Sequence, residues 1–132
     1  MPVTHRIQDD LLVFKASDEV SAEDFYAACD KIHSDPAFRP PIDALVDLRE
    51  AQVDIPGKQI ENMVYHLKAG GHYHKMVIVA ARGSFTYAMG RMFCLHAECI
   101  GFSSEIFLNR MEALAWLEGP KGDARLPLDD GG

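Results

Sequence analysis

The sequence contains little cysteine, with three residues among 132, and none of them forms a Cys-x-x-Cys pair. This odd number without paired spacing argues against a disulfide framework or a zinc finger. Cys29, Cys94 and Cys99 lie in stretches with helical periodicity, where free cysteine behaves as a small hydrophobe. We therefore expect reduced, buried thiols, since a chain of this length can bury a sufficient core without cross-links.

Basic residues are scarce as well. Thirteen Lys and Arg stand against twenty Asp and Glu, which gives a formal net charge of -7. The basic residues are scattered, so the chain lacks the positive surface from which counterion release drives binding to nucleic acid. We expect no nucleic-acid partner.

Long apolar runs are also missing. No stretch reaches the roughly 18 consecutive apolar residues that suggest a membrane-spanning helix. The first residues, Met1–Arg6, lack the basic and then apolar pattern of a signal peptide. These absences predict a cytoplasmic protein with no membrane span.

Strand and helix patterns alternate along the rest of the chain. Short β-branched or continuous apolar runs predict strands over residues 3–7, 11–16, 42–48, 75–81 and 102–108. Apolar residues at three- and four-residue spacing predict helices over residues 21–33, 54–69, 84–100 and 109–117. The order predicts an α/β fold with a mixed, mainly parallel five-stranded sheet covered by about four helices. We expect one domain over residues 1–118 and a disordered acidic tail over residues 119–132.

Four short segments carry a family resemblance. They are Leu45–Arg49 on the third predicted strand, Ala80 at the end of the fourth, Gly90–Phe93 in the long helix and Glu112–Leu117 in the last one. With the order of elements, they make residues 4–117 resemble the SpoIIAA-like, STAS-type family of small bacterial proteins. The resemblance implies a mixed sheet with helices around it, no cofactor, and a non-catalytic role in regulation, protein interaction or small-molecule binding.

One feature of that family is missing. Its anti-sigma-factor antagonists carry a phosphorylatable serine at the start of the helix after the third strand, whereas residues 47–59 contain neither serine nor threonine. We therefore expect a STAS-like regulatory or protein-interaction module without that switch. The alternative is a binding protein or sensor for a small apolar or amphipathic anionic ligand. An enzyme is the less favoured hypothesis, because the chain has neither a Gly-x-Ser-x-Gly elbow nor a phosphate loop.

Polar residues that follow the third and fourth predicted strands form the candidate ligand site. Ligands of open α/β sheets bind beyond the carboxyl ends of the parallel strands, and a helix N-terminus there favours an anion. The apolar part of the ligand would lie along the long helix. The competing hypothesis is structural, with Ser84 or Thr86 capping that helix and a local ion pair beside it. The candidate residues are Asp47, Arg49, Arg82, Ser84, Thr86, Met89, Arg91 and Phe93.

The predicted helix from Tyr87 to Ile100 is apolar nearly all round, which indicates burial on more than one side. Contact with a second subunit in a homodimer, or with a protein partner, is the preferred explanation, because large apolar patches are rarely left exposed. Plain core packing and a hydrophobic ligand pocket are the alternatives. Arg91 needs a partner on such a helix, and we expect an ion pair with Glu98 or Asp47.

Three histidines near the fourth predicted strand are candidate ligands of a metal site. His72 and His74 flank Tyr73, and His66 precedes them on a predicted helix. A zinc site also needs hydrogen-bond acceptors that orient its ligands and a fixed geometry, and the spacing of the histidines shows neither. We expect ordinary surface histidines and no metal.

Overall fold

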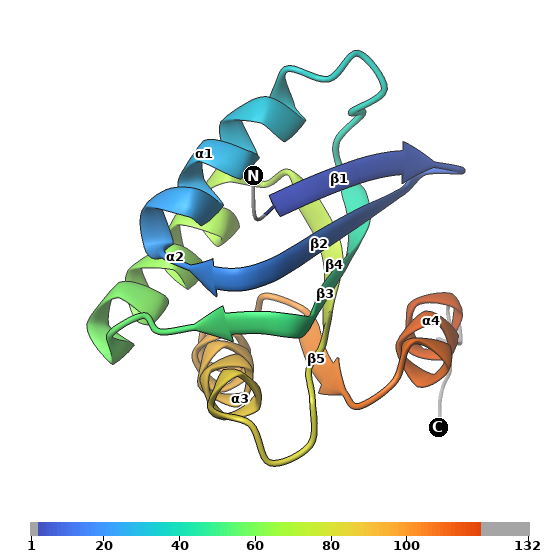
Figure 1. The fold of residues 1–132 in the computed structure, drawn as a ribbon. Coiled ribbons are helices and arrows are strands. Elements are labelled where there is room, and N and C mark those ends of the chain that lie inside the picture. Colours follow the sequence, from blue (N-terminus) through green and yellow to red (C-terminus); the bar gives the residue numbers. More distant parts are fainter. Residues whose placement is uncertain (1–2, 120–132) are drawn as a thin grey trace.

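A computed structural model describes residues 3–119 and places their five strands in one sheet of order β1-β2-β3-β4-β5 (Figure 1). β1 pairs antiparallel with β2, and the remaining neighbours pair in parallel. This confirms the predicted α/β class and the mixed, mainly parallel sheet. Residues 120–132 of the predicted tail lie outside the described residues. The elements are β1 (Val3–Gln8), β2 (Leu11–Val20), α1 (Ala22–His33), β3 (Ile42–Val53), α2 (Gly57–Gly70), β4 (Tyr73–Val79), α3 (Phe85–Cys99), β5 (Ser104–Phe107) and α4 (Arg110–Glu118).

Side-chain caps fix the start of three helices. Ser21 and Asp24 form a capping box at α1, in which each side chain accepts a hydrogen bond from the other residue's backbone N–H. Ser84 accepts from the N–H of Tyr87 at α3, and Asn109 accepts from that of Glu112 at α4. These polar residues satisfy donors that the first helical turn leaves unpaired.

β2 and β3 are longer than the sequence indicates. Beyond the predicted ends they pair in parallel from Ser17 with Glu50 to Val20 with Val53, after a register shift that follows Lys15. The extensions contain exposed as well as buried residues, so they lack the continuous apolar run that marks the first halves of these strands. α2 begins after Pro56, without a side-chain hydrogen bond at its cap.

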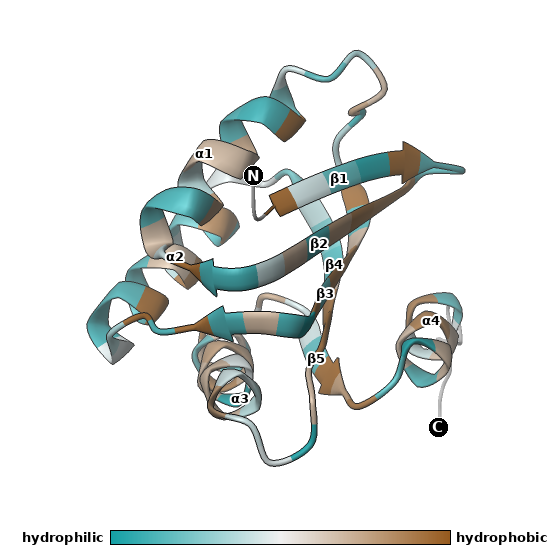
Figure 2. Ribbon diagram, viewed as in Figure 1, coloured by the Kyte–Doolittle hydropathy of each residue, from teal (hydrophilic) through white to brown (hydrophobic). Residues whose placement is uncertain are grey.

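The sheet has one face covered by three helices and one covered by a single helix. Helices α1, α2 and α3 pack on the first face, and α4 lies on the opposite side (Figure 1). The core under α4 includes Leu45, Val77 and Leu117. Figure 2 shows hydrophobic residues along the central strands, with hydrophilic segments on the outer sides of α1 and α2. Within residues 3–119, no helix combines the length and apolar character needed to cross a membrane.

Candidate functional site

A partly open apolar cavity of about 110 Å³ lies between the first face of the sheet and helices α1, α2 and α3. Three neighbouring strands form its floor, where alternate residues of each strand point to the same face. Ala44 is the smallest side chain of this floor and is fully buried. A small residue among large ones leaves room that its neighbours do not fill. The floor residues are Leu12, Phe14, Ala44, Val46, Met76 and Ile78.

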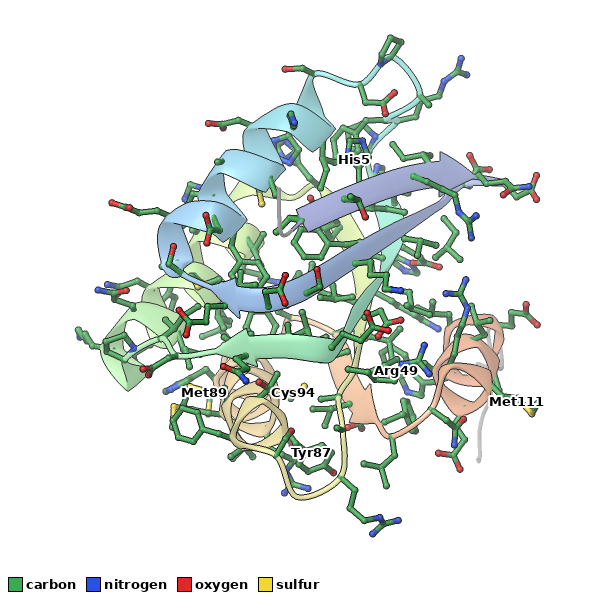
Figure 3. All side chains as sticks on the ribbon, in the orientation of Figure 1. His5, Arg49, Tyr87, Met89, Cys94 and Met111 are labelled. Atoms are coloured by element: carbon green, nitrogen blue, oxygen red, sulfur yellow. The ribbon has the colours of Figure 1, made fainter. Side chains whose placement is uncertain are left out.

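The walls of the cavity come from the apolar sides of the three helices. α1 contributes Phe25, whose ring stacks on Phe14 with centroids 5.5 Å apart, and α2 contributes Ile60 and Met63. The wall from α3 includes Met89, which lies on the side of α3 nearer α2 (Figure 3). Methionine adapts to irregular apolar shapes, so two of the wall positions can adjust to a guest.

Solvent-exposed residues of both α1 and α2 line one part of the cavity. Tyr26 of α1 and His66 of α2 both line the cavity and are partly exposed to solvent. Their rings meet edge to face with centroids 5.7 Å apart. Few polar side chains line the cavity, and its surface consists almost entirely of carbon atoms.

Two titratable side chains of the cavity lining, those of Tyr73 and Cys29, have raised pKa values. The Tyr73 hydroxyl lies 3.3 Å from Nε2 of His33, and burial raises the pKa of this phenol far above its ordinary value. Burial also raises the pKa of the Cys29 thiol. Since a thiolate is the reactive form of cysteine, a protonated Cys29 is a poor nucleophile. The lining is suited to neutral apolar groups.

Three of the predicted site residues lie at this cavity. Met89, Phe93 and Thr86 belong to its lining. Arg82 and Ser84 lie outside the lining, and the Ser84 hydroxyl is used in capping α3 and in donating to the carbonyl of Ala81. The predicted ligand site is thus divided, with the apolar part at the cavity and the cationic part away from it.

Asp47 and Arg49 form a bidentate ion pair on the other face of the sheet. The guanidinium donates from Nε to Oδ1 at 3.0 Å and from the terminal nitrogen to Oδ2 at 2.8 Å. Asp47 follows Leu45 by two residues and pairs with Val79, so it shares the face covered by α4, as Figure 3 shows for Arg49. Hydrogen bonds from Arg49 lower the pKa of the Asp47 carboxyl. The charges of Asp47 and Arg49 therefore neutralise each other, which agrees with the hypothesis of a local ion pair given in the sequence analysis.

Arg91 does not form either of the predicted ion pairs. Asp47 is bound by Arg49, and Glu98 lies two helical turns from Arg91. Among the described residues, neither Arg91 nor Glu98 comes within ion-pair distance of an opposite charge. Both side chains are exposed on α3.

The histidines near β4 are dispersed. His66 lines the cavity, His74 is 3.2 Å from a carboxylate oxygen of Asp43, and the ring of His72 packs at 4.4 Å against His33. Residues 3–119 contain no cluster of three potential metal ligands. The sequence patterns missed the position of Tyr26 at the cavity, because nothing in its spacing shows that α1 borders a cavity.

Comparisons with known proteins identify the fold. Neither a family model nor a curated protein sequence matches this chain. The structure is similar to the crystal structure of an uncharacterized protein of the DUF3478 family, with a SpoIIAA-like fold, from Shewanella loihica PV-4. The match has a TM-score of 0.58 and 21% identity, and it covers 87% of this chain and 91% of that one. The chain has a SpoIIAA-like fold.

The SpoIIAA-like fold confirms the architecture that the sequence segments indicated. In this SpoIIAA-like chain, α2 begins at Gly57 after Pro56, and no serine or threonine occurs between Asp47 and Gln59. The start of the helix after the third strand therefore offers no hydroxyl for a phosphate. At this level of identity the likeness concerns the fold alone, and the cavity must be argued from its own residues.

Proposed function

We propose that this protein binds a small apolar molecule, or the apolar end of an amphipathic one, in the cavity beneath α1, α2 and α3. The observation that carries the proposal is the cavity itself, which has about 110 Å³ of space and a nearly continuous carbon lining. An engineered apolar cavity of about 150 Å³ stays dry and binds benzene. A benzene-sized group, or a short stretch of alkyl chain, is of the right scale.

The solvent-exposed part of the lining supports a binding role and suggests where a polar end would lie. Tyr26 and His66 supply a hydroxyl and an imidazole there. A ligand that enters beside them can keep its polar end in water while its apolar end displaces no hydrogen bonds. Partial burial raises the pKa of the Cys29 thiol, and a less available thiolate favours a binding role over a catalytic one.

Native mass spectrometry of protein purified without detergent tests the proposal. We expect either a bound small molecule or, for empty protein, saturable binding of added benzene or 1-octanol that raises the thermal midpoint. Ala44→Leu, which adds three carbon atoms to the cavity floor, should abolish that rise. Leu117→Ala provides the matched control, since it weakens the core under α4 and leaves the cavity intact. Equal responses of wild type and Ala44→Leu would contradict the proposal.

A second candidate function is contact with another protein molecule, as expected of a STAS-like module. Two large apolar side chains of α3, Phe85 and Leu95, are 61% and 56% exposed. Exposed apolar residues gathered on one helix are typical of an interaction surface. Three free cysteines suit a reducing compartment, so we also propose a cytoplasmic location.

A further inference from the structure

We propose that α3 pairs with the α3 helix of a second copy of this chain, antiparallel and about a two-fold axis. The inference rests on the contact role proposed above for α3 and is independent of ligand binding in the cavity. It identifies the partner as a homodimer subunit, and it assigns Arg91 and Glu98 to reciprocal ion pairs across the interface.

The outer side of α3 carries an apolar stripe. Phe85, Ala88, Leu95 and Cys99 are all exposed, at intervals of three, seven and four residues. Apolar residues with this spacing form the seam along which two helices pack. The opposite side of α3 already faces the sheet. Its buried residues are Thr86, Gly90, Phe93 and Ala97.

α3 differs in this respect from its neighbours on the same face of the sheet. In Figure 2 the ribbon of α3 is mostly pale to brown, whereas α1 and α2 show extended hydrophilic segments. Arg91 and Glu98 are the only Lys, Arg, Asp or Glu residues between Phe85 and Cys99. The apolar outer side of α3 is therefore exposed to water in the monomer, although apolar helix faces are normally packed against another element.

The two charges of α3 lie on one flank of the stripe. They are seven residues apart, so they have nearly the same direction around the helix and a separation of about 10.5 Å along it. That separation is too large for an ion pair between them, and neither has another partner of opposite charge among the described residues. Each chain therefore presents one positive and one negative side chain along the same flank of α3, and neither forms an ion pair among the described residues.

An antiparallel pair satisfies both charges at once. A two-fold axis perpendicular to the helices reverses their direction but keeps the same flank on the same side of the interface. With the axis midway between Arg91 and Glu98, Arg91 of each copy faces Glu98 of the other, and Leu95 lies next to the axis. In a parallel pair the two flanks would lie on opposite sides, and the charges would stay unpaired. Complementary charge thus selects the antiparallel arrangement.

The size of the stripe predicts a weak dimer. Stable interfaces bury about 1,600 Å² in total, and contacts below about 1,200 Å² are typical of transient complexes. One helix seam belongs to the smaller class. We expect association that depends on protein concentration within the micromolar to millimolar range.

Charge exchange tests this geometry in the full chain. Sedimentation equilibrium should show dimers of the wild type, roughly 10-fold weaker association for Arg91→Glu and for Glu98→Arg, and recovery in the double variant that exchanges both charges. An equimolar mixture of the two single variants should form heterodimers, because every cross-interface pair is then opposite in sign. Leu95→Glu should give monomers. Arg82→Glu, a charge reversal outside α3, serves as the control, and circular dichroism checks that each variant is folded.

The outcomes separate this inference from the proposed ligand binding. A wild type that is monomeric at every concentration would overturn the inference. A dimer whose dissociation constant is unchanged by the charge reversals and by Leu95→Glu would overturn it as well. Either result leaves the cavity proposal standing, since the octanol-induced thermal rise is measured on the same samples. A dimer that weakens with each single charge reversal and recovers with the exchange supports the antiparallel pair.

Discussion

Thr86 and Val53 join the first turn of α3 to the end of β3. The Thr86 hydroxyl accepts a hydrogen bond from the N–H of Val53 at 3.1 Å and donates one to the carbonyl of Ala51 at 3.0 Å. Both Thr86 and Val53 are buried and both line the cavity. The two buried hydrogen bonds therefore fix α3, a wall of the cavity, to β3, which contributes to its floor.

Replacing Thr86 by Val keeps the shape of the side chain and removes both bonds. A buried N–H and a buried carbonyl then lose their partner, which costs about 1–3 kcal/mol of unfolding free energy. Urea denaturation measures the loss, and Thr86→Ser, which retains the hydroxyl, should recover most of it. Equal stability of the Val and Ser variants would show that the hydroxyl contributes nothing.

Gly90 lies where α3 packs tightly against β4 and β5. A Cβ atom built there would lie 2.6 Å from Cδ1 of Ile106 on β5. Gly90→Ala should therefore destabilise the protein by about 1–3 kcal/mol through overpacking, despite the better helix propensity of alanine. Ile106→Val removes the contacted methyl, so the double variant should be more stable than Gly90→Ala alone. Thermal melts of the three variants decide this, and additive effects would argue against the contact.

The ion pair of Asp47 and Arg49 makes the unfolding free energy depend on pH in the acid range. Hydrogen bonds from Arg49 hold the pKa of the Asp47 carboxyl below its ordinary value of 3.8 in the folded state. The contribution is thus present above pH 3.8 and is lost as the pH falls through the folded pKa. Asp47→Asn should cost about 1–2 kcal/mol at neutral pH and should flatten the acid branch of the stability curve. Asp54→Asn, which removes an exposed carboxyl, is the control, and identical curves for the two variants would contradict the assignment.

His33 adds a second acid-sensitive contribution at higher pH. Partial desolvation of the His33 ring, which remains exposed to solvent, is followed by the proximity of His72 as a cause, and both lower the pKa of His33 below its ordinary value of 6.5. The unfolded chain therefore takes up this proton first, and the unfolding free energy decreases as the pH falls from 6.5 to the folded pKa. His33→Gln should reduce the difference between urea midpoints measured at about pH 7.5 and about pH 5. His74→Gln replaces an exposed imidazole for comparison. If the His33→Gln variant shows the same difference between its two urea midpoints as the wild type, protonation of His33 does not contribute to the pH dependence.

Local sequence patterns were sufficient for much of the fold. The capping residues Ser21, Ser84 and Asn109 act on neighbours three residues away, so their partners could be read along the chain. The extensions of β2 and β3 could not be predicted from the local sequence. Their polar residues are held by pairing with a strand some thirty residues distant, as in Asp18 with Ala51.

The site was predictable only in part for the same reason. Met89 and Phe93 stand on one side of a helix, and their periodicity indicated an apolar environment. The other walls depend on how α1 sits over Phe14 and Ala44, which is a matter of packing between distant segments. The ion pair of Asp47 with Arg49 shows the opposite case, since partners two residues apart were visible as a local alternative.

A methyl-detected NMR titration with benzene tests the central claim, that the cavity takes up an apolar guest, most directly. Two sets of methyl groups lie in the same molecule, with Ile60 and Ile78 at the cavity and Leu45 and Val77 in the core under α4. The account predicts saturable shifts of the cavity methyl signals and unchanged signals from the other set. Signals at Ile60 and Ile78 that do not move, or shifts of the same size in both sets, would contradict it.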